Sequence, residues 1–177
     1  MALSLGLAFF LVLAAPASAE RAAGLGMTPN QVFNVWFNIN EALIASSDVI
    51  APESGVKEAL MELSPASVPD GKQMVDVLIR VETFRQRLDA LRRSEGLPTS
   101  RTVQFRSPEV TSSYVFVNSS HLLNALVDWL IRNTPPEQLV GHFYRRRDFR
   151  EKTLAEVYAL VDLAQRRMEL LLRARKG

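Results

Sequence analysis

Apolar residues recur every three or four positions in two long stretches of the chain, 71–94 and 153–175. The repeated positions are Met74, Val77, Val81, Phe84, Leu88 and Leu91 in the first stretch, and Leu154, Val157, Val161, Ala164, Met168 and Leu171 in the second. This spacing places the apolar side chains on one side of an α-helix. It predicts two amphipathic helices whose narrow apolar stripes pack in a helical bundle.

Two further long helices are predicted at 29–46 and 108–132. The stretch 108–132 carries a wider apolar stripe, and 29–46 is apolar on almost all sides. A helix of the second kind is expected either to be the most buried one or to offer a face to a partner.

Start signals and prolines divide the chain between these helices. Thr28-Pro29-Asn30-Gln31 matches a capping box with proline at the first helical position, and further signals occur at 70–73, 107–109, 134–137 and 153–156. Shorter helices are expected near 53–62 and 135–142, and the alternating segment 101–105 could be extended. We therefore predict an all-α domain over residues 20–177, a helical bundle of four main helices plus one or two short ones.

Residues 76–93 resemble residues 156–173 at an offset of 80 positions, with matching acids, apolar positions and trailing arginines. One interpretation is a duplicated helical hairpin, in which the first and third helices correspond as the second and fourth do. The alternative is that two amphipathic helices resemble each other because both pack along the same kind of bundle seam.

Residues 1–19 are predicted to be a signal peptide. The apolar run Leu3–Ala15 ends in Ala17-Ser18-Ala19, a small-x-small cleavage pattern, although no basic residue precedes the run. An uncleaved membrane anchor is the alternative, for which the run is short. The expected location is periplasmic or secreted, in a bacterium, and the absence of cysteine means that the fold relies on its core.

Composition and motifs argue against several classes of function. The net charge is only +2, which does not favour nucleic acid as a partner, and no segment after the first reaches membrane-spanning length. Neither histidine has the Glu-x-x-His spacing of a di-iron bundle, and the haem, zinc and nucleotide motifs are absent. We therefore expect no metal, no cofactor and no catalytic residue.

Three groups of residues are candidates for binding. Tyr114, Asn118 and His121 share one face of the helix 108–132, where they could bind a small polar ligand or sense pH, or else form an ordinary solvated face. Asn40 lies among apolar neighbours that include Trp36, so it is expected to be buried. It could fix helix register or line a pocket with Trp36.

The third group is the most basic segment of the chain, 142–150, with Arg145, Arg146 and Arg147 between aromatic residues. It could bind an anionic ligand, lipid headgroups or an acidic partner. The alternative is a surface loop whose aromatic residues close the end of the bundle while its arginines stay in water.

These observations support three hypotheses of function. The first is an exported, non-catalytic binding or adaptor module that acts through protein–protein contacts or self-association, suggested by the almost wholly apolar helix 29–46. The second is a periplasmic sensor or binding protein with a small-ligand pocket in the bundle, and the third is an enzyme of unknown class.

Overall fold

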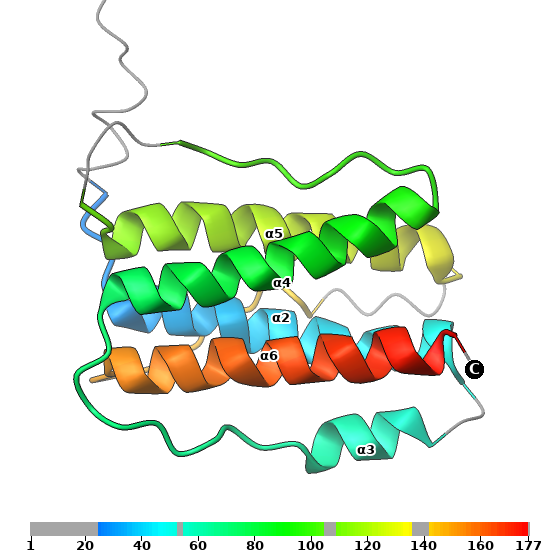
Figure 1. Ribbon diagram of the computed structural model, residues 1–177, viewed down its shortest axis with the longest axis horizontal. Coiled ribbons are helices and arrows are strands. Elements are labelled where there is room, and N and C mark those ends of the chain that lie inside the picture. The colour runs from blue at the N-terminus through cyan, green and yellow to red at the C-terminus, as the bar shows by residue number, and fades with distance from the viewer. Residues whose placement is uncertain (1–24, 53–54, 105–108, 136–141, 177) are drawn as a thin grey trace, which may run out of the picture.

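The computed structural model describes residues 25–52, 55–104, 109–135 and 142–176 (Figure 1). Within these residues the chain forms five α-helices: α2 (Pro29–Ile50), α3 (Val56–Glu62), α4 (Met74–Ser94), α5 (Ser112–Asn133) and α6 (Leu154–Ala174). The predicted all-α fold, with four long helices and a short one, is confirmed. The predicted signal peptide 1–19 and most of the predicted short helix 135–142 lie outside the described residues.

All four long helices run in the same direction along the bundle, from left to right in Figure 1. Pairs of residues at matching depths support this orientation. Near the helix starts, Trp36 of α2 donates a hydrogen bond to Ser119 of α5 over 2.9 Å. Near the helix ends, Arg92 of α4 pairs with Asp128 of α5 at 3.0 Å, and Arg175, just after α6, pairs with Glu95 at 3.0 Å. The chain therefore returns along the bundle between successive long helices.

This parallel arrangement corrects the predicted helical hairpins, because neighbouring long helices are not antiparallel (Figure 1). It also explains the charges of the repeat. Aligned helices bring their positive dipole ends together at one end of the bundle and their negative ends together at the other. Acids occupy the first turns of α4 and α6, and arginines occupy the last turns of α4, α5 and α6. Each of these charged side chains therefore lies near a helix end whose partial charge has the opposite sign.

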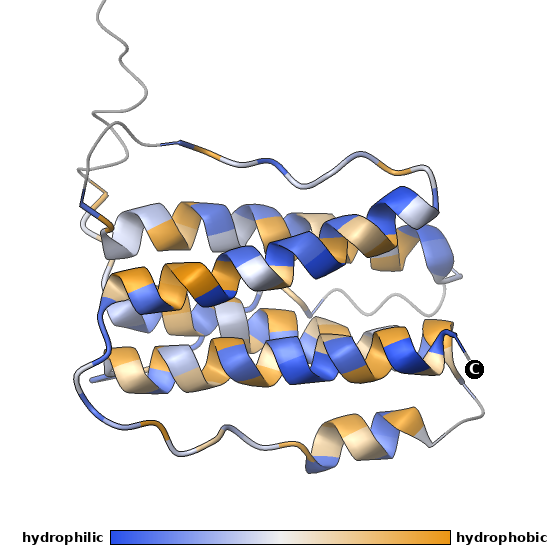
Figure 2. Ribbon diagram, in the orientation of Figure 1, coloured by the Kyte–Doolittle hydropathy of each residue, from blue (hydrophilic) through white to orange (hydrophobic). Residues whose placement is uncertain are grey.

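The core lies between the four long helices, each of which combines apolar and polar positions along its length (Figure 2). Helices α5 and α6 both pack against α2, and both also pack against α4. Across the centre, the rings of Trp36 and Phe84 meet edge to face with centroids 5.2 Å apart. Val32, Ile39 and Leu43 of α2 are completely buried. The bundle thus encloses α2, which accounts for the apolar character of this helix.

The observed helix boundaries differ from the predicted ones by a few residues. Helix α4 begins at Met74 rather than at 71, because Asp76 accepts the Gln73 N–H at 2.8 Å and so caps the helix there. Helix α5 begins at Ser112 rather than at 108, with Thr111 as its N-cap residue. Helix α2 continues to Ile50, four residues beyond its predicted end.

The connecting segments 63–73 and 97–104 are extended and run along the bundle (Figure 1). Such a segment has no neighbouring strand, so its backbone N–H and C=O groups need other partners. In 63–73, Arg166 donates to Ser64 O at 2.7 Å and Arg167 donates to Leu63 O at 3.2 Å. Helix side chains therefore hold this connection in place. None of the described helices is long and apolar enough to cross a membrane.

Candidate functional site

Trp36 and Asn40, two of the predicted binding residues, lie in the interior of the bundle. Trp36 is completely buried, and its indole N–H donates to Ser119. The Asn40 amide donates to Trp36 O at 2.9 Å and to Leu160 O of α6 at 3.1 Å. Its oxygen accepts from Arg167 at 3.0 Å. These bonds join α2 to α6 at one fixed height, the position at which a buried amide can set the register of two helices.

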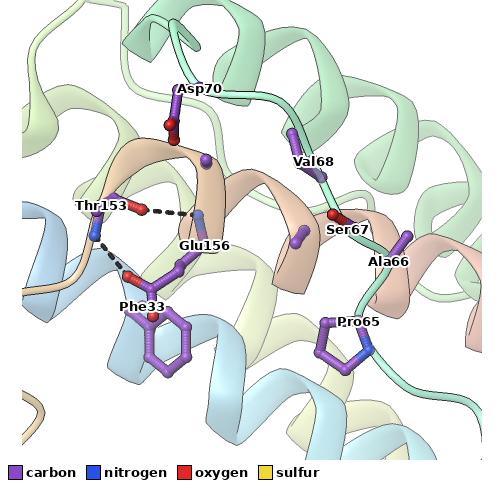
Figure 3. A pocket seen from close by; sticks show the side chains of 10 residues that line it. Phe33, Pro65, Ala66, Ser67, Val68, Asp70, Thr153 and Glu156 are labelled. Carbon is purple, nitrogen blue, oxygen red and sulfur yellow. Dashed lines mark hydrogen bonds between the residues drawn. The ribbon is translucent and has the colours of Figure 1, made fainter.

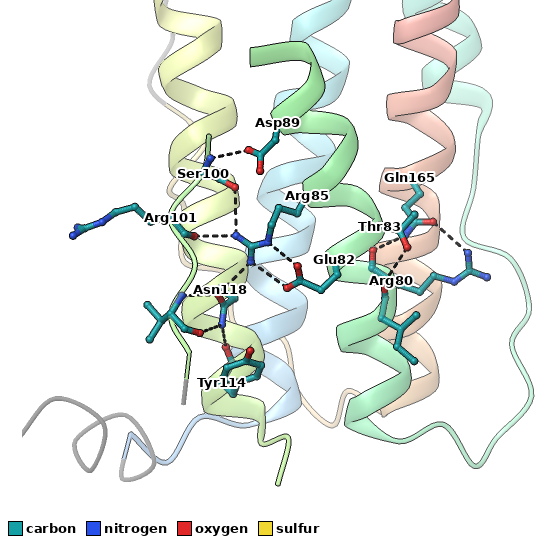
Figure 4. A network of polar contacts seen from close by, with 12 residues as sticks. Arg80, Glu82, Thr83, Arg85, Asp89, Ser100, Arg101, Tyr114, Asn118 and Gln165 are labelled. Atoms are coloured by element: carbon teal, nitrogen blue, oxygen red, sulfur yellow. Dashed lines mark hydrogen bonds and ion pairs between the residues drawn. The ribbon is translucent and has the colours of Figure 1, made fainter. Parts of the chain in front are cut away.

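Asn118, predicted on the polar face of the third long helix, is completely buried and so does not belong to a solvated face. Its amide group faces the extended segment 97–104, which lies beside α4 and α5 (Figure 4). Arg85 donates to the Asn118 oxygen at 3.2 Å and to Arg101 O at 2.9 Å. The Ser100 N–H reaches Asp89 at 2.7 Å. These polar side chains hold the segment against the bundle rather than lining a cavity.

Tyr114 and His121 lie on the same helix and are half-buried. Asn118 donates to Tyr114 O at 3.1 Å, so this stretch of α5 belongs to the same polar network (Figure 4). Burial lowers the pKa of His121, and the positive charges of Arg101 and Arg85 lower it further. The three residues of this predicted group therefore lie beside a segment of the chain itself.

Three asparagines of α2, spaced one helical turn apart, hold the basic segment 142–152. Asn34 and Asn38 both donate to Arg145 O, at 3.2 and 3.0 Å. The Asn34 oxygen accepts the Arg147 N–H at 2.9 Å, and the Asn30 oxygen accepts the Lys152 N–H at 2.9 Å. We call Asn30, Asn34 and Asn38 the asparagine ladder. These asparagines were not among the predicted site residues, although their spacing of i, i+4 and i+8 is visible in the sequence.

Aromatic contacts fix the same segment along α2. The ring of Phe149 packs edge to face on Phe33, with centroids 4.9 Å apart, and lies 5.4 Å from Phe37. The Arg147 guanidinium stacks over Phe37 at 4.0 Å and lies 3.8 Å from Glu41. The segment therefore combines docked aromatic residues with exposed arginines.

A groove opens between α2, α5 and this segment, with a volume of about 780 Å³. This volume falls in the range of small-ligand sites, roughly 300–1,000 Å³. We call it the α2–α5 groove. It is lined by Met27, Asn30, Gln31, Asn34, Val35, Asn38, Phe116, Ser120, Leu123, Asn124, Tyr144, Arg146, Arg147, Asp148 and Phe149.

Two of the three predicted arginines line the α2–α5 groove, and they differ in their partners. Arg147 is engaged by Phe37 and Glu41. Arg146 is exposed and makes no hydrogen bond or ion pair with any described residue. Arg145 does not line the groove, and its guanidinium contacts His142 at 2.7 Å. Of the three, Arg146 is the one available to a ligand.

A smaller hollow of about 350 Å³ lies between the segment 65–70 and the start of α6 (Figure 3). Its polar groups serve the helix. Glu156 accepts the Thr153 N–H at 2.8 Å, and the Thr153 hydroxyl accepts the Glu156 N–H at 3.2 Å. The Lys152 side chain and the Thr153 N–H lower the pKa of Glu156. The chemistry of this hollow is therefore that of a helix cap.

Among the residues that the structure describes, no three His, Cys, Asp or Glu side chains come close enough together to hold a metal ion.

The chain was compared with known proteins in three ways. No family model matches it, and neither a curated protein nor a solved structure matches it.

Proposed function

We propose that the protein is an exported, non-catalytic binding module that takes a small anionic ligand in the α2–α5 groove. The observation that carries the proposal is Arg146, an arginine that lines a groove of about 780 Å³ and has no polar partner among the described residues. A guanidinium offers several donors in a fixed plane, a geometry suited to carboxylate and phosphate groups. The export part of the proposal rests on the predicted signal peptide.

The distribution of charge supports an anion over a cation. Arg147 lies near Glu41, and Asp148 pairs with Arg150 at 3.2 Å. The charges within each pair offset each other, which leaves the charge of Arg146 uncompensated among the described lining residues. The lining residues also support the non-catalytic part of the proposal, because they include no histidine among the described residues and Asp148 as their one carboxylate.

The test is thermal unfolding with a panel of small carboxylates and phosphates, each compared with a neutral analogue of similar shape. A ligand at about 100 times its dissociation constant stabilises the folded state by ~2.7 kcal/mol. We expect anions but not their neutral analogues to raise the melting temperature, and Arg146→Ser to abolish the increase. Arg101→Ser is the matched control, since Arg101 is also exposed within a non-helical segment and its side chain points away from the bundle (Figure 4). Equal stabilisation of Arg146→Ser and the native chain would overturn the proposal.

A protein–protein contact is the second candidate. The apolar character of the helix 29–46 first suggested this hypothesis, but the enclosure of α2 in the bundle accounts for it. A different observation favours it now: Val75 and Ile79, one turn apart on α4, are 42% and 61% exposed. Light scattering of the native chain and of Ile79→Lys tests self-association through this face. A monomeric native chain over a wide concentration range would exclude that form of the hypothesis.

A further inference from the structure

We infer that the ligand of the α2–α5 groove is an anionic amphiphile, with one negatively charged head group at Arg146 and an apolar tail along the floor of the groove. This inference rests on the proposed function and narrows it to a chemical class. It depends on three features of the groove: its floor, its rim and its size.

Four apolar side chains from the sides of α2 and α5 line the α2–α5 groove, and we call them its floor. Met27 and Val35 line it from the side of α2, and Phe116 and Leu123 line it from the side of α5. Helices α2 and α5 are parallel (Figure 1) and pack against each other, so the groove between them follows their common direction. Phe116 and Leu123 are seven positions apart on α5, roughly 10 Å at the rise of an α-helix. A linear apolar chain fits such a floor better than a compact polar molecule does.

Most polar groups of the rim already have partners within the chain. Asn30 and Asn34 hold the segment 142–152, and the Ser120 hydroxyl donates to the Phe116 carbonyl of its own helix at 2.8 Å. The side chains of Arg146 and Asn124 line the groove, are exposed, and have no polar contact with the described residues. The rim therefore offers one positive charge, one amide and the hydroxyl of the exposed Tyr144, a set that suits a single monoanionic head group.

The size of the groove favours an amphiphile over a simple anion as its ligand. A carboxylate or phosphate alone would leave most of the 780 Å³ unfilled and the half-buried side chains of Met27 and Phe116 in contact with water. An alkyl or aryl tail attached to the anion would cover that floor and gain affinity from each buried methylene group.

The experiment is a titration series with linear alkyl carboxylates: butanoate, hexanoate, octanoate and decanoate, all below their critical micelle concentrations. Calorimetry on the full chain should show an affinity that rises roughly two- to fourfold for each added methylene group. Octyl sulfate and octyl phosphate distinguish a carboxylate head group from other anions. Octanol and octyltrimethylammonium test whether the negative charge is needed.

Three variants complete the experiment. Arg146→Ser should weaken octanoate binding at least tenfold, whereas Arg101→Ser should leave it unchanged. Ser120→Phe places a ring in the groove at a residue whose hydroxyl bonds to the Phe116 carbonyl of its own helix. It should remove the dependence of affinity on chain length while the melting temperature of the free protein stays close to that of the native chain.

The outcomes distinguish the amphiphile inference from the proposed anion-binding function on which it rests. Arg146-dependent binding that does not change with chain length would overturn the amphiphile and leave the anion-binding module standing. Equal binding of octanol and octanoate would overturn the charged head group. If neither these compounds nor the small anions bind, the proposed function itself is wrong.

Discussion

Asn118 and Val103 are joined by two hydrogen bonds that resemble those of a β-ladder. The Asn118 amide donates to Val103 O at 3.2 Å, and its oxygen accepts the Val103 N–H at 3.1 Å. A side-chain amide carries the same donor and acceptor as a peptide group. One asparagine of α5 thus replaces the neighbouring strand that this extended segment lacks.

Asn118→Ala is expected to destabilise the protein by roughly 2–4 kcal/mol. The change leaves one donor of the buried Arg85 and both backbone polar groups of the half-buried Val103 without their partner, and each such loss costs about 1–3 kcal/mol in a buried site and less where water can reach the group. Urea unfolding measures the effect. The control is Asn124→Ala on the same helix, which is exposed and should change stability by less than about 0.5 kcal/mol. Equal effects of the two variants would show that Asn118 does not hold the segment.

Asn34→Ala should release the segment 142–152 locally without unfolding the bundle. The variant removes two of the hydrogen bonds to this segment, one at Arg145 O and one at the Arg147 N–H. Amide hydrogen exchange at Arg147 should become roughly 5–30 times faster, the factor that corresponds to a loss of 1–2 kcal/mol. Exchange in the middle of α4 serves as the internal control and should not change.

The fold could be predicted from the sequence because its main signals are local. Apolar spacing reports which side of a helix is buried, and capping residues such as Thr28 and Thr153 mark where helices begin. The starts of α2 and α6 were predicted to within one residue for this reason. The relative direction of the helices is not a local property, since an amphipathic helix can pack its apolar stripe against a parallel or an antiparallel neighbour. The hairpin interpretation was therefore wrong about the direction of neighbouring helices.

The candidate site was harder to predict because its residues combine only in three dimensions. The position of Asn118 on its helix does not reveal that residues 97–104 cover it. Arg145, Arg146 and Arg147 are adjacent and chemically identical, yet the structure gives them different surroundings. The asparagine ladder is the exception, because Asn30, Asn34 and Asn38 follow helical spacing and could have been recognised.

Arg167 and Asn40 are expected to be energetically coupled. The buried Arg167 guanidinium donates to Leu60 O at 3.0 Å, to Leu63 O at 3.2 Å and to Asn40 at 3.0 Å, and so attaches α3 to the bundle. Arg167→Met should cost roughly 3 kcal/mol or more, because several buried acceptors lose their donor. Asn40→Leu should then cost about 1 kcal/mol less in the Arg167→Met background than alone, which a double-mutant cycle by chemical unfolding measures. Additive effects would mean that the two residues act independently.

His121 should make the protein less stable as the pH falls below about 6.5. Burial, together with Arg101 and Arg85, lowers the pKa of His121 in the folded state from the ordinary value of 6.5. The unfolded chain therefore takes up a proton first, and the free energy of unfolding decreases as the pH falls from 6.5 to the lowered pKa of the folded state. Urea unfolding at pH 7.5 and pH 5.5 should show this loss, and His121→Gln should reduce it.

Two comparisons test the assignment to His121. Arg101→Ser removes one of the charges that lower the pKa of His121, so it should reduce the same loss while the histidine is kept. The pKa values of Asp128 and Glu156 are lowered from 3.8 and 4.5, so their stabilisation is present above those values and is lost at more acidic pH. The interval from pH 7.5 to 5.5 lies above the pKa values of both carboxylates, so neither contributes to the loss of stability in this interval. An unchanged pH dependence in His121→Gln would therefore exclude His121 as its cause.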